Sequence, residues 1–131
     1  MFKIHAGIVA VEHHGKFKQL QKIHIEPIDF VFTNLYPFES VLAMFTNDTV
    51  KAFSEFDLGG PALIRSAVKN LSRVTVVTSP DDYETVLWHI AQNNKIPLAI
   101  KKQLAIKALA HLAAYDAAAL DAISELEVEI D

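Results

Sequence analysis

The stretch DLGGPALIRSAVKN, residues 57–70, brings an acid, two adjacent glycines and two cations close together in the chain. Gly59 and Gly60 let the backbone approach a bound group, because neither residue carries a Cβ atom. Pro61 suits the first turn of a helix, where its missing N–H is not needed. The free N–H groups and the positive dipole end of such a helix can hold an anion or a developing oxyanion.

Spacing alone favours a plainer interpretation of this stretch. Short glycine motifs are weak indicators of a site, and these two glycines could simply form a turn. Arg65 and Lys69 lie four residues apart and share one face of the expected helix, where both could be solvated. The choice between a ligand-binding site and a simple turn therefore depends on the rest of the chain.

Two apolar runs rich in β-forming residues predict buried parallel strands, IDFVFTNLYP at 28–37 and RVTVVTS at 73–79. A weaker strand candidate is IHAGIVAV at 4–11. Ser79 has the properties of a helix N-cap, and Pro80 fits the first helical position after it. Strands that alternate with helices indicate an α/β fold with a parallel sheet and helices on both faces.

The helices show apolar stripes at helical spacing. The helix after Ser79 has one face formed by Tyr83, Val86, Leu87 and Ile90. A second helical pattern, in one helix or two, runs from residue 98 to 126 with a stripe of Leu104, Ala108, Leu112 and Tyr115. Ligands of parallel sheets bind beyond the carboxyl ends of the strands. This rule points to residues 34–38 and to residues 57–60.

Composition limits the possible classes of protein. The 131 residues suit one domain, and the absence of cysteine excludes disulfides and thiolate chemistry and fits the cytoplasm. A net charge of −4 with interspersed signs argues against nucleic acid as a partner. Apolar runs are too short for a membrane span, and the histidines lack metal-ligand spacing. The hydrophobic fraction of 51% predicts a large core or apolar surface covered by another chain.

Several motifs occur in an order that together is far more specific than any one of them: KIHAGIVA at 3–10, IEPIDFVFTNLYPFE at 25–39, DLGGPALIRSAVKN at 57–70, RVTVVTSPDDYE at 73–84 and KALAHLAAYDAA at 107–118. This series resembles the inosine monophosphate (IMP) cyclohydrolase domain of the bifunctional purine biosynthesis protein. The resemblance covers nearly the whole chain.

The resemblance implies ring closure of a purine ribonucleotide precursor. A formylated aminoimidazole carboxamide ribotide loses water and becomes IMP when its carboxamide nitrogen attacks its formyl carbon. An amide nitrogen is a poor nucleophile, so the reaction needs positioning, stabilisation of charge on the formyl oxygen, and proton transfer. The family's reaction requires no metal and no organic cofactor.

The same resemblance assigns the site residues. Tyr36 matches a family tyrosine that can hydrogen-bond the reacting groups, and Asp57 matches an aspartate that contacts the carboxamide. Lys69 matches a lysine near the formyl oxygen. The backbone of Leu58, Gly59 and Gly60 is expected to contact the base. The acid, the glycines and the lysine are then expected to form one wall of a pocket.

The resemblance also predicts the organisation of the chain. Residues 1–131 are expected to form a single partial cyclohydrolase-like domain, with an incomplete three-layer αβα parallel sheet of the methylglyoxal-synthase-like type and an alanine-rich C-terminal helical part. The family's upstream phosphate-binding loop and its downstream formyltransferase domain have no counterpart in these residues. A start at Met1 leaves natural start, truncation and misassigned start open.

Three functional hypotheses follow. The chain could be a cyclohydrolase completed by a complementing chain or a homo-oligomer, since the family works as a homodimer. It could be a non-catalytic truncated remnant. It could also be a nucleotide-binding or dimerising module. Without the phosphate loop, the isolated chain is expected to be weakly active or inactive.

Overall fold

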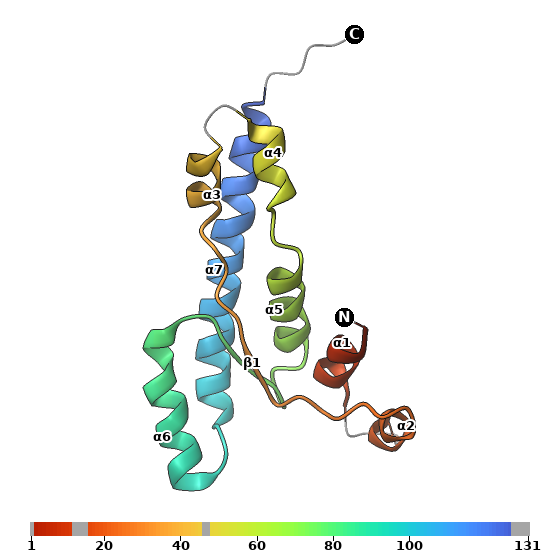
Figure 1. Ribbon diagram of the computed structural model, residues 1–131. Coiled ribbons are helices and arrows are strands. Elements are labelled where there is room, and N and C mark those ends of the chain that lie inside the picture. Colours follow the sequence, from red (N-terminus) through yellow and green to blue (C-terminus); the bar gives the residue numbers. More distant parts are fainter. Residues whose placement is uncertain (1, 12–15, 46–47, 127–131) are drawn as a thin grey trace.

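The computed structural model describes residues 2–11, 16–45 and 48–126 (Figure 1). Helices form most of the described chain, and its sheet has two strands. The elements in chain order are α1 (Phe2–Val9), α2 (Lys16–Lys22), β1 (Phe30–Phe32), α3 (Phe38–Met44), α4 (Thr49–Ser54), α5 (Gly59–Lys69), β2 (Thr75–Val77), the 3₁₀ turn η2 (Pro80–Asp82), α6 (Tyr83–Asn93) and α7 (Leu98–Ser124).

The two strands confirm the predicted parallel α/β class. β1 and β2 run parallel, with Val31 opposite Val76 at the centre of the register. Both strands lie inside the predicted ranges 28–37 and 73–79, but each has only three residues. Beyond Thr33, whose N–H still donates to the Val77 carbonyl at 3.0 Å, the first range is unpaired chain that leads into α3.

Helices pack on both faces of β2, as the alternation of strands and helices predicts. Val76 belongs to a core cluster with Ile64 of α5 and Ala108 of α7. Val77 belongs to a second cluster with Val86 of α6. Successive strand residues point to opposite faces of a sheet, so these two clusters lie on opposite sides of β2.

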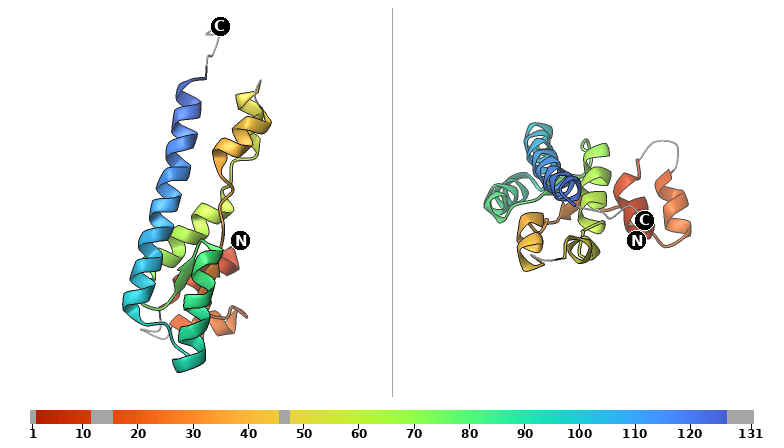
Figure 2. Two further views of the ribbon diagram at one scale, coloured as in Figure 1. Left: turned by 90° about the vertical axis from the view of Figure 1, so that its left-hand side faces the viewer. Right: turned by 90° about the horizontal axis from the view of Figure 1, so that it is seen from above.

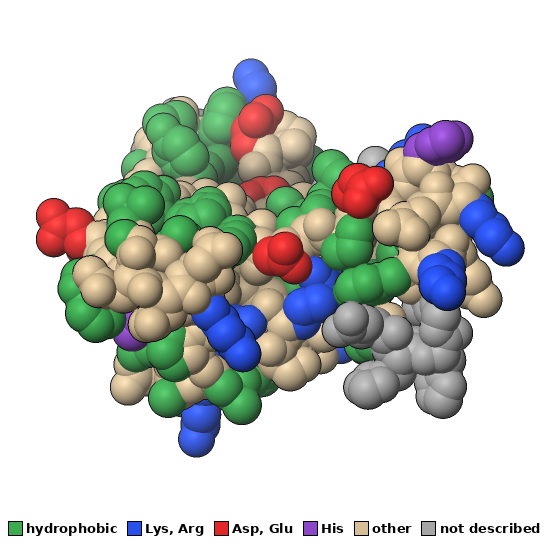
Figure 3. All heavy atoms as spheres, turned by 90° about the horizontal axis from the view of Figure 1, so that it is seen from below, with side chains coloured by type: hydrophobic (Ala, Val, Ile, Leu, Met, Phe, Trp, Pro, Cys, Tyr) green, Lys and Arg blue, Asp and Glu red, His purple; other side chains and the backbone are tan. Residues whose placement is uncertain are grey.

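The second face of β1 is less well covered. Phe30 and Phe32 are 36% and 51% exposed, although Tyr83 of α6 packs edge-on against Phe32. Leu87, on the predicted apolar face of α6, is also exposed. Seen from below, hydrophobic side chains gather on the side of the molecule that α6 occupies (Figure 3). Part of the high apolar content is therefore at the surface.

The predicted strand at 4–11 is wrong, because these residues lie mainly in helix α1. The last carbonyls of a helix have no partner within the helix and need other donors. The side-chain amide of Asn70 donates to the carbonyls of Ile8 and Ala10 at 2.8 and 2.9 Å. This buried contact at the end of α5 stabilises a helical end for α1.

Arg73 connects α1 to the chain that leads into β1. A Cβ atom at Gly7 would lie 2.6 Å from the Glu26 carbonyl oxygen, so the two segments meet closely only because residue 7 is glycine. The Arg73 guanidinium lies at this junction. It donates to the carbonyls of Gly7, Ile8, Ala10 and Ile28 and to the carboxylate of Asp29.

The helical predictions for the second half of the chain are confirmed. The Ser79 hydroxyl accepts from the Asp81 N–H at 3.3 Å, Pro80 begins the 3₁₀ turn, and α6 follows directly. The range 98–126 contains one helix, α7, which runs along one side of the molecule (Figure 2). Its predicted stripe is buried: Leu104, Ala108, Leu112 and Tyr115. Among the described residues, no helix is long and apolar enough to cross a membrane.

Candidate functional site

Tyr36 and Asp57, two of the predicted catalytic residues, line the same hollow of about 430 Å³. Tyr36 follows β1, and Asp57 lies two residues before α5, so the hollow lies near the carboxyl end of β1. The other residues that line it are Val41, Met44, Phe45 and Glu55. This described lining contains two carboxylates and no cation, so it does not by itself attract a phosphate group.

Asp57 is held from two directions. One carboxylate oxygen, Oδ1, accepts from the Gly60 N–H at 3.0 Å, and the Asp57 N–H donates to the Tyr115 hydroxyl oxygen at 2.7 Å. A carboxylate beside a helix N-terminus is stabilised by the unpaired N–H groups and by the helix dipole. Asp57 therefore already accepts from one of the N–H groups at the start of α5, that of Gly60.

Glycine is required at position 60 by close packing. A Cβ atom there would lie 2.5 Å from Oδ2 of Asp57 and 2.6 Å from Cδ2 of the buried Leu35. Leu58 is 74% exposed, so a ligand could reach its backbone. The predicted base-binding residues are Leu58, Gly59 and Gly60, and they form the turn at the start of α5. In the chain this turn directly follows Asp57, which lines the hollow.

Lys69 lies at the opposite end of α5 from Asp57. It is exposed and occupies the last helical position, whereas Gly60 lies in the first turn. A rise of 1.5 Å per residue separates these positions by about 14 Å along the axis. Within one chain, Lys69 therefore does not share a wall with Asp57 and the glycines, contrary to the predicted arrangement.

Tyr115 positions Asp57, a role that the sequence did not reveal. Its ring lies in a cluster of aromatic side chains, stacked on Phe56 at 5.2 Å and edge-on to Phe38 at 5.9 Å between ring centroids. Burial raises the pKa of the Tyr115 hydroxyl, the hydrogen bond from the Asp57 N–H lowers it in part, and the Asp57 and Asp116 carboxylates raise it, so that the net shift is upward. The hydroxyl therefore stays neutral at physiological pH and can accept the Asp57 N–H. The helical stripe predicted only that Tyr115 is buried.

We expect Tyr115→Phe to release the Asp57 backbone without unfolding the chain. The ring stays in its cluster, but the Asp57 N–H loses its acceptor, which costs about 1 kcal/mol of unfolding free energy. Amide hydrogen exchange measured by NMR should become faster at Asp57. Tyr83→Phe is the matched control and should leave this amide unchanged, because no hydrogen bond of the Tyr83 hydroxyl is described. Unchanged exchange in Tyr115→Phe would contradict the positioning role.

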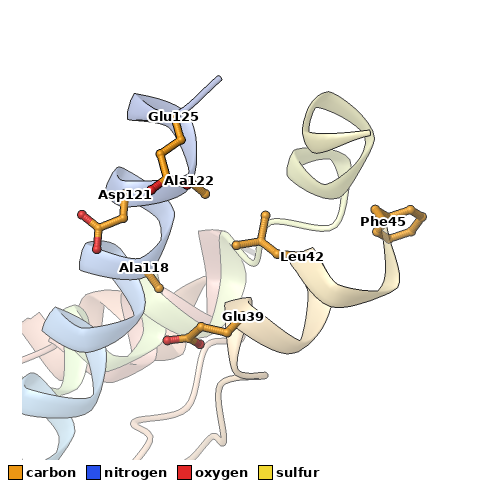
Figure 4. Close-up of a pocket in the computed structure, with 7 residues that line it drawn as sticks. All are labelled: Glu39, Leu42, Phe45, Ala118, Asp121, Ala122 and Glu125. Atoms are coloured by element: carbon orange, nitrogen blue, oxygen red, sulfur yellow. The ribbon is translucent and has the colours of Figure 1, made fainter. Parts of the chain in front are cut away.

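A second hollow, of about 520 Å³, lies between α3 and the C-terminal half of α7 (Figure 4). Three carboxylates line it, from Glu39, Asp121 and Glu125, together with Leu42, Phe45, Ala118 and Ala122. Its negative charge disfavours a phosphorylated ligand. Within the described ranges, no group of three or more His, Asp or Glu residues is placed to hold a metal ion.

The fold and the site together define a class: a helix-rich α/β chain in which an acid-led glycine turn opens a helix beside a parallel sheet. Comparison with known proteins identifies the family to which the chain is similar. The family model of the AICARFT/IMPCHase bienzyme matches residues 67–130. The bifunctional purine biosynthesis protein PurH of Halalkalibacterium halodurans is 44% identical over 115 residues, and that of Shouchella clausii is 42% identical over the same length.

The chain therefore belongs to the PurH family, as an IMP cyclohydrolase-like part of it, and the resemblance seen in the motifs is confirmed. Each alignment covers 87% of this chain but 22% of the relative, so the chain spans about a fifth of these proteins' length. The crystal structure of ForH superposes with a TM-score of 0.80 at 29% identity. That match covers 94% of this chain and 64% of ForH.

Proposed function

We propose that this chain contributes the hollow between Tyr36 and Asp57 to an IMP cyclohydrolase site in purine biosynthesis. The observation that carries the proposal is that both side chains line one hollow while two hydrogen bonds orient Asp57. The names of the relatives support purine biosynthesis as the pathway. The substrate would be the formylated aminoimidazole carboxamide ribotide, with the reaction in the cytoplasm.

The proposed reaction is an intramolecular condensation. The carboxamide nitrogen attacks the formyl carbon and forms the new C–N bond of the ring. The carboxamide nitrogen and the formamide nitrogen each lose one proton, the former formyl oxygen gains both protons, and the C–O bond breaks to release water as the C=N bond to the formamide nitrogen forms. Holding the two groups in contact supplies much of the rate enhancement, because the attack is then intramolecular and oriented.

The proposed roles follow from what each group can donate or accept. Asp57 Oδ1 already accepts from Gly60, so Oδ2 is the oxygen that can accept a proton from the carboxamide nitrogen. The Tyr36 side chain is 65% exposed in the hollow, and its hydroxyl can donate to the formyl oxygen as charge develops there. The backbone of Leu58, Gly59 and Gly60 can contact the base.

Two requirements of the reaction are not met by these residues alone. The described lining of the hollow contains no cation for the ribose phosphate, and Lys69 lies at the far end of α5. We therefore propose that a complementing segment or chain supplies the phosphate contacts, and that Lys69 assists only in an assembly that brings it to a substrate. β1 pairs with β2 alone among the described strands. This supports residues 1–131 as a partial domain of a larger three-layer sheet of the methylglyoxal-synthase-like type.

The test is complementation. We expect the 131-residue chain alone to close the ring slowly or not at all, because nothing in the described hollow holds the phosphate. Adding the separately produced N-terminal segment of the Halalkalibacterium halodurans PurH should restore turnover, followed by absorbance of the formylated ribotide. The segment alone is the control for contaminating activity.

Two results would decide against parts of the proposal. Full turnover by the chain alone would show that no complementing segment is needed. Absence of turnover in a complex shown by size exclusion to contain both parts would favour a non-catalytic remnant or a nucleotide-binding module.

A further inference from the structure

We propose that a groove between α1 and α2 binds a helix of a partner protein, one that carries carboxylates along both sides of an apolar face. The groove, called here the α1–α2 groove, has a volume of about 360 Å³. The two helices lie side by side, on the side of the molecule opposite α6 (Figure 1). The inference does not depend on catalysis at Asp57, because no described residue lines both this groove and the hollow beside Asp57. The residues that line the α1–α2 groove are Ala6, Val9, Ala10, Gln19, Leu20 and Ile23.

The α1–α2 groove is an exposed apolar surface. Gln19 is the one polar side chain in its described lining, and Val9 and Ile23 are 39% and 51% exposed. Phe2 precedes Ala6 by four residues, so it lies on the same face of α1, and it is 77% exposed. Apolar side chains that gather in one exposed hollow indicate a surface that another molecule covers.

Positive charge is concentrated in the part of the chain that forms this groove. Residues 1–24 contain four lysines and one glutamate, a formal charge of +3. The whole chain has a formal charge of −4, so residues 25–131 have a formal charge of −7. Seen from below, basic side chains lie on the side of the molecule that α2 occupies (Figure 3). Such a charge asymmetry within one chain favours an acidic partner at this end.

One lysine of each helix lies beside the apolar lining. Lys3 precedes Ala6 by three residues in α1, and Lys22 follows Gln19 by three residues in α2. Residues three apart are neighbours on a helix surface, and both lysines are exposed. The described lining contains no carboxylate that could pair with them. A ligand that fits the groove therefore needs an apolar centre with negative charges on both sides.

A helix suits this groove better than a membrane or a nucleic acid does. Amphipathic helices bind by laying their apolar face in a groove, with anchoring residues three or four positions apart. Ala6 and Ala10 lie four residues apart, and their small side chains let a third helix come close. The eight residues of α1 extend for about 12 Å, enough for about two turns of a bound helix. A bilayer surface is flat and would leave the hollow unfilled, and the described lining has no aromatic side chain on which a base could stack.

Binding of a synthetic helix tests the proposal. The probe is a fluorescently labelled peptide of about four helical turns, with leucines three and four residues apart and glutamates on both sides of them. The control peptide has lysine in place of every glutamate. In fluorescence anisotropy at low salt, the 131-residue chain should bind the acidic peptide at least about tenfold more tightly than the lysine peptide. This preference should become smaller as salt is added, because exposed charges are screened.

Variants of the chain locate the binding. Ile23→Ser and the double variant Lys3→Glu/Lys22→Glu should each weaken binding of the acidic peptide about tenfold, because the first removes an apolar contact and the second reverses both charges. The matched controls are Leu87→Ser on α6 and Lys102→Glu on α7, which should bind as the unaltered chain does. All of these side chains are exposed, so each variant should keep the fold.

Three results would overturn the proposal. The first is equal binding of the acidic and the lysine peptide, or equal losses in the groove variants and their controls. The second is co-sedimentation with phosphatidylserine vesicles that Ile23→Ser abolishes, without binding of the acidic peptide, which would assign the groove to a membrane. The third is displacement of the peptide by the N-terminal segment of the Halalkalibacterium halodurans PurH, which would place the groove inside the complemented domain.

Discussion

Replacing Asp57 by asparagine is expected to reduce ring closure by about 100-fold or more in the complemented enzyme. The asparagine keeps an oxygen for the Gly60 N–H but cannot accept a proton from the carboxamide nitrogen. Loss of a positioned acid–base group typically has an effect of this size. The measurement is turnover of the formylated ribotide at saturating complementing segment, together with the binding of that segment.

Tyr36→Phe should also reduce turnover, because the hollow then loses the hydroxyl that we propose as a donor to the formyl oxygen. Arg65→Ala is the control, since Arg65 forms an exposed ion pair with Asp116 at 2.7 Å and takes no part in the proposed chemistry. Equal losses in Asp57→Asn and Arg65→Ala would mean that the hollow has been assigned wrongly. A loss in Lys69→Ala as large as that in Asp57→Asn would show that the assembled enzyme brings this lysine to the substrate.

Arg73→Ala should lower the free energy of unfolding by about 3 kcal/mol or more. The guanidinium satisfies the carbonyls of four residues and pairs with Asp29, and its side chain is only 19% exposed. Removal leaves several partly buried carbonyls without a donor, and each such loss costs about 1–3 kcal/mol, although the losses are not additive. Urea unfolding followed by circular dichroism measures the change.

Arg65→Ala provides a matched control for this truncation. The Arg65 side chain is 55% exposed and has one described partner, so its loss should cost about 0–1 kcal/mol. Protection of α1 amides from hydrogen exchange should fall in Arg73→Ala and not in Arg65→Ala. If both variants unfold at the same urea concentration, Arg73 does not hold α1 in place.

Local signals in the sequence predicted the elements that depend on neighbouring residues. Ser79 and Pro80 predicted the start of the helical segment that leads into α6, because capping acts within a few residues. Apolar spacing predicted the buried stripe of α7, and the run at 73–79 predicted β2. The acid and glycines of residues 57–60 predicted the turn that opens α5.

Contacts between distant residues could not be predicted in this way. The helical end of α1 depends on Asn70 and Arg73, about sixty residues further along the chain. The bond between Asp57 and Tyr115 joins positions 58 residues apart. The separation of Lys69 from Asp57 could have been predicted from the sequence. Asp57 comes just before the eleven-residue helix α5 and Lys69 is its last residue, so the two residues must lie at opposite ends of the helix. Helix geometry, applied to the motif, could have corrected that expectation.

The single long helix α7 contacts both the sheet and the segment that contains Asp57. Leu104 packs with the sheet, and Tyr115 holds Asp57, eleven residues later and thus close to three full turns. One residue inserted between Leu104 and Tyr115 would rotate Tyr115 by about 100° about the helix axis, while Leu104 would keep its orientation toward the sheet. Asp57 would then lose its hydroxyl partner although every side chain near it was unchanged. The orientation of Tyr115 toward Asp57 therefore depends on the number of helical residues between Leu104 and Tyr115.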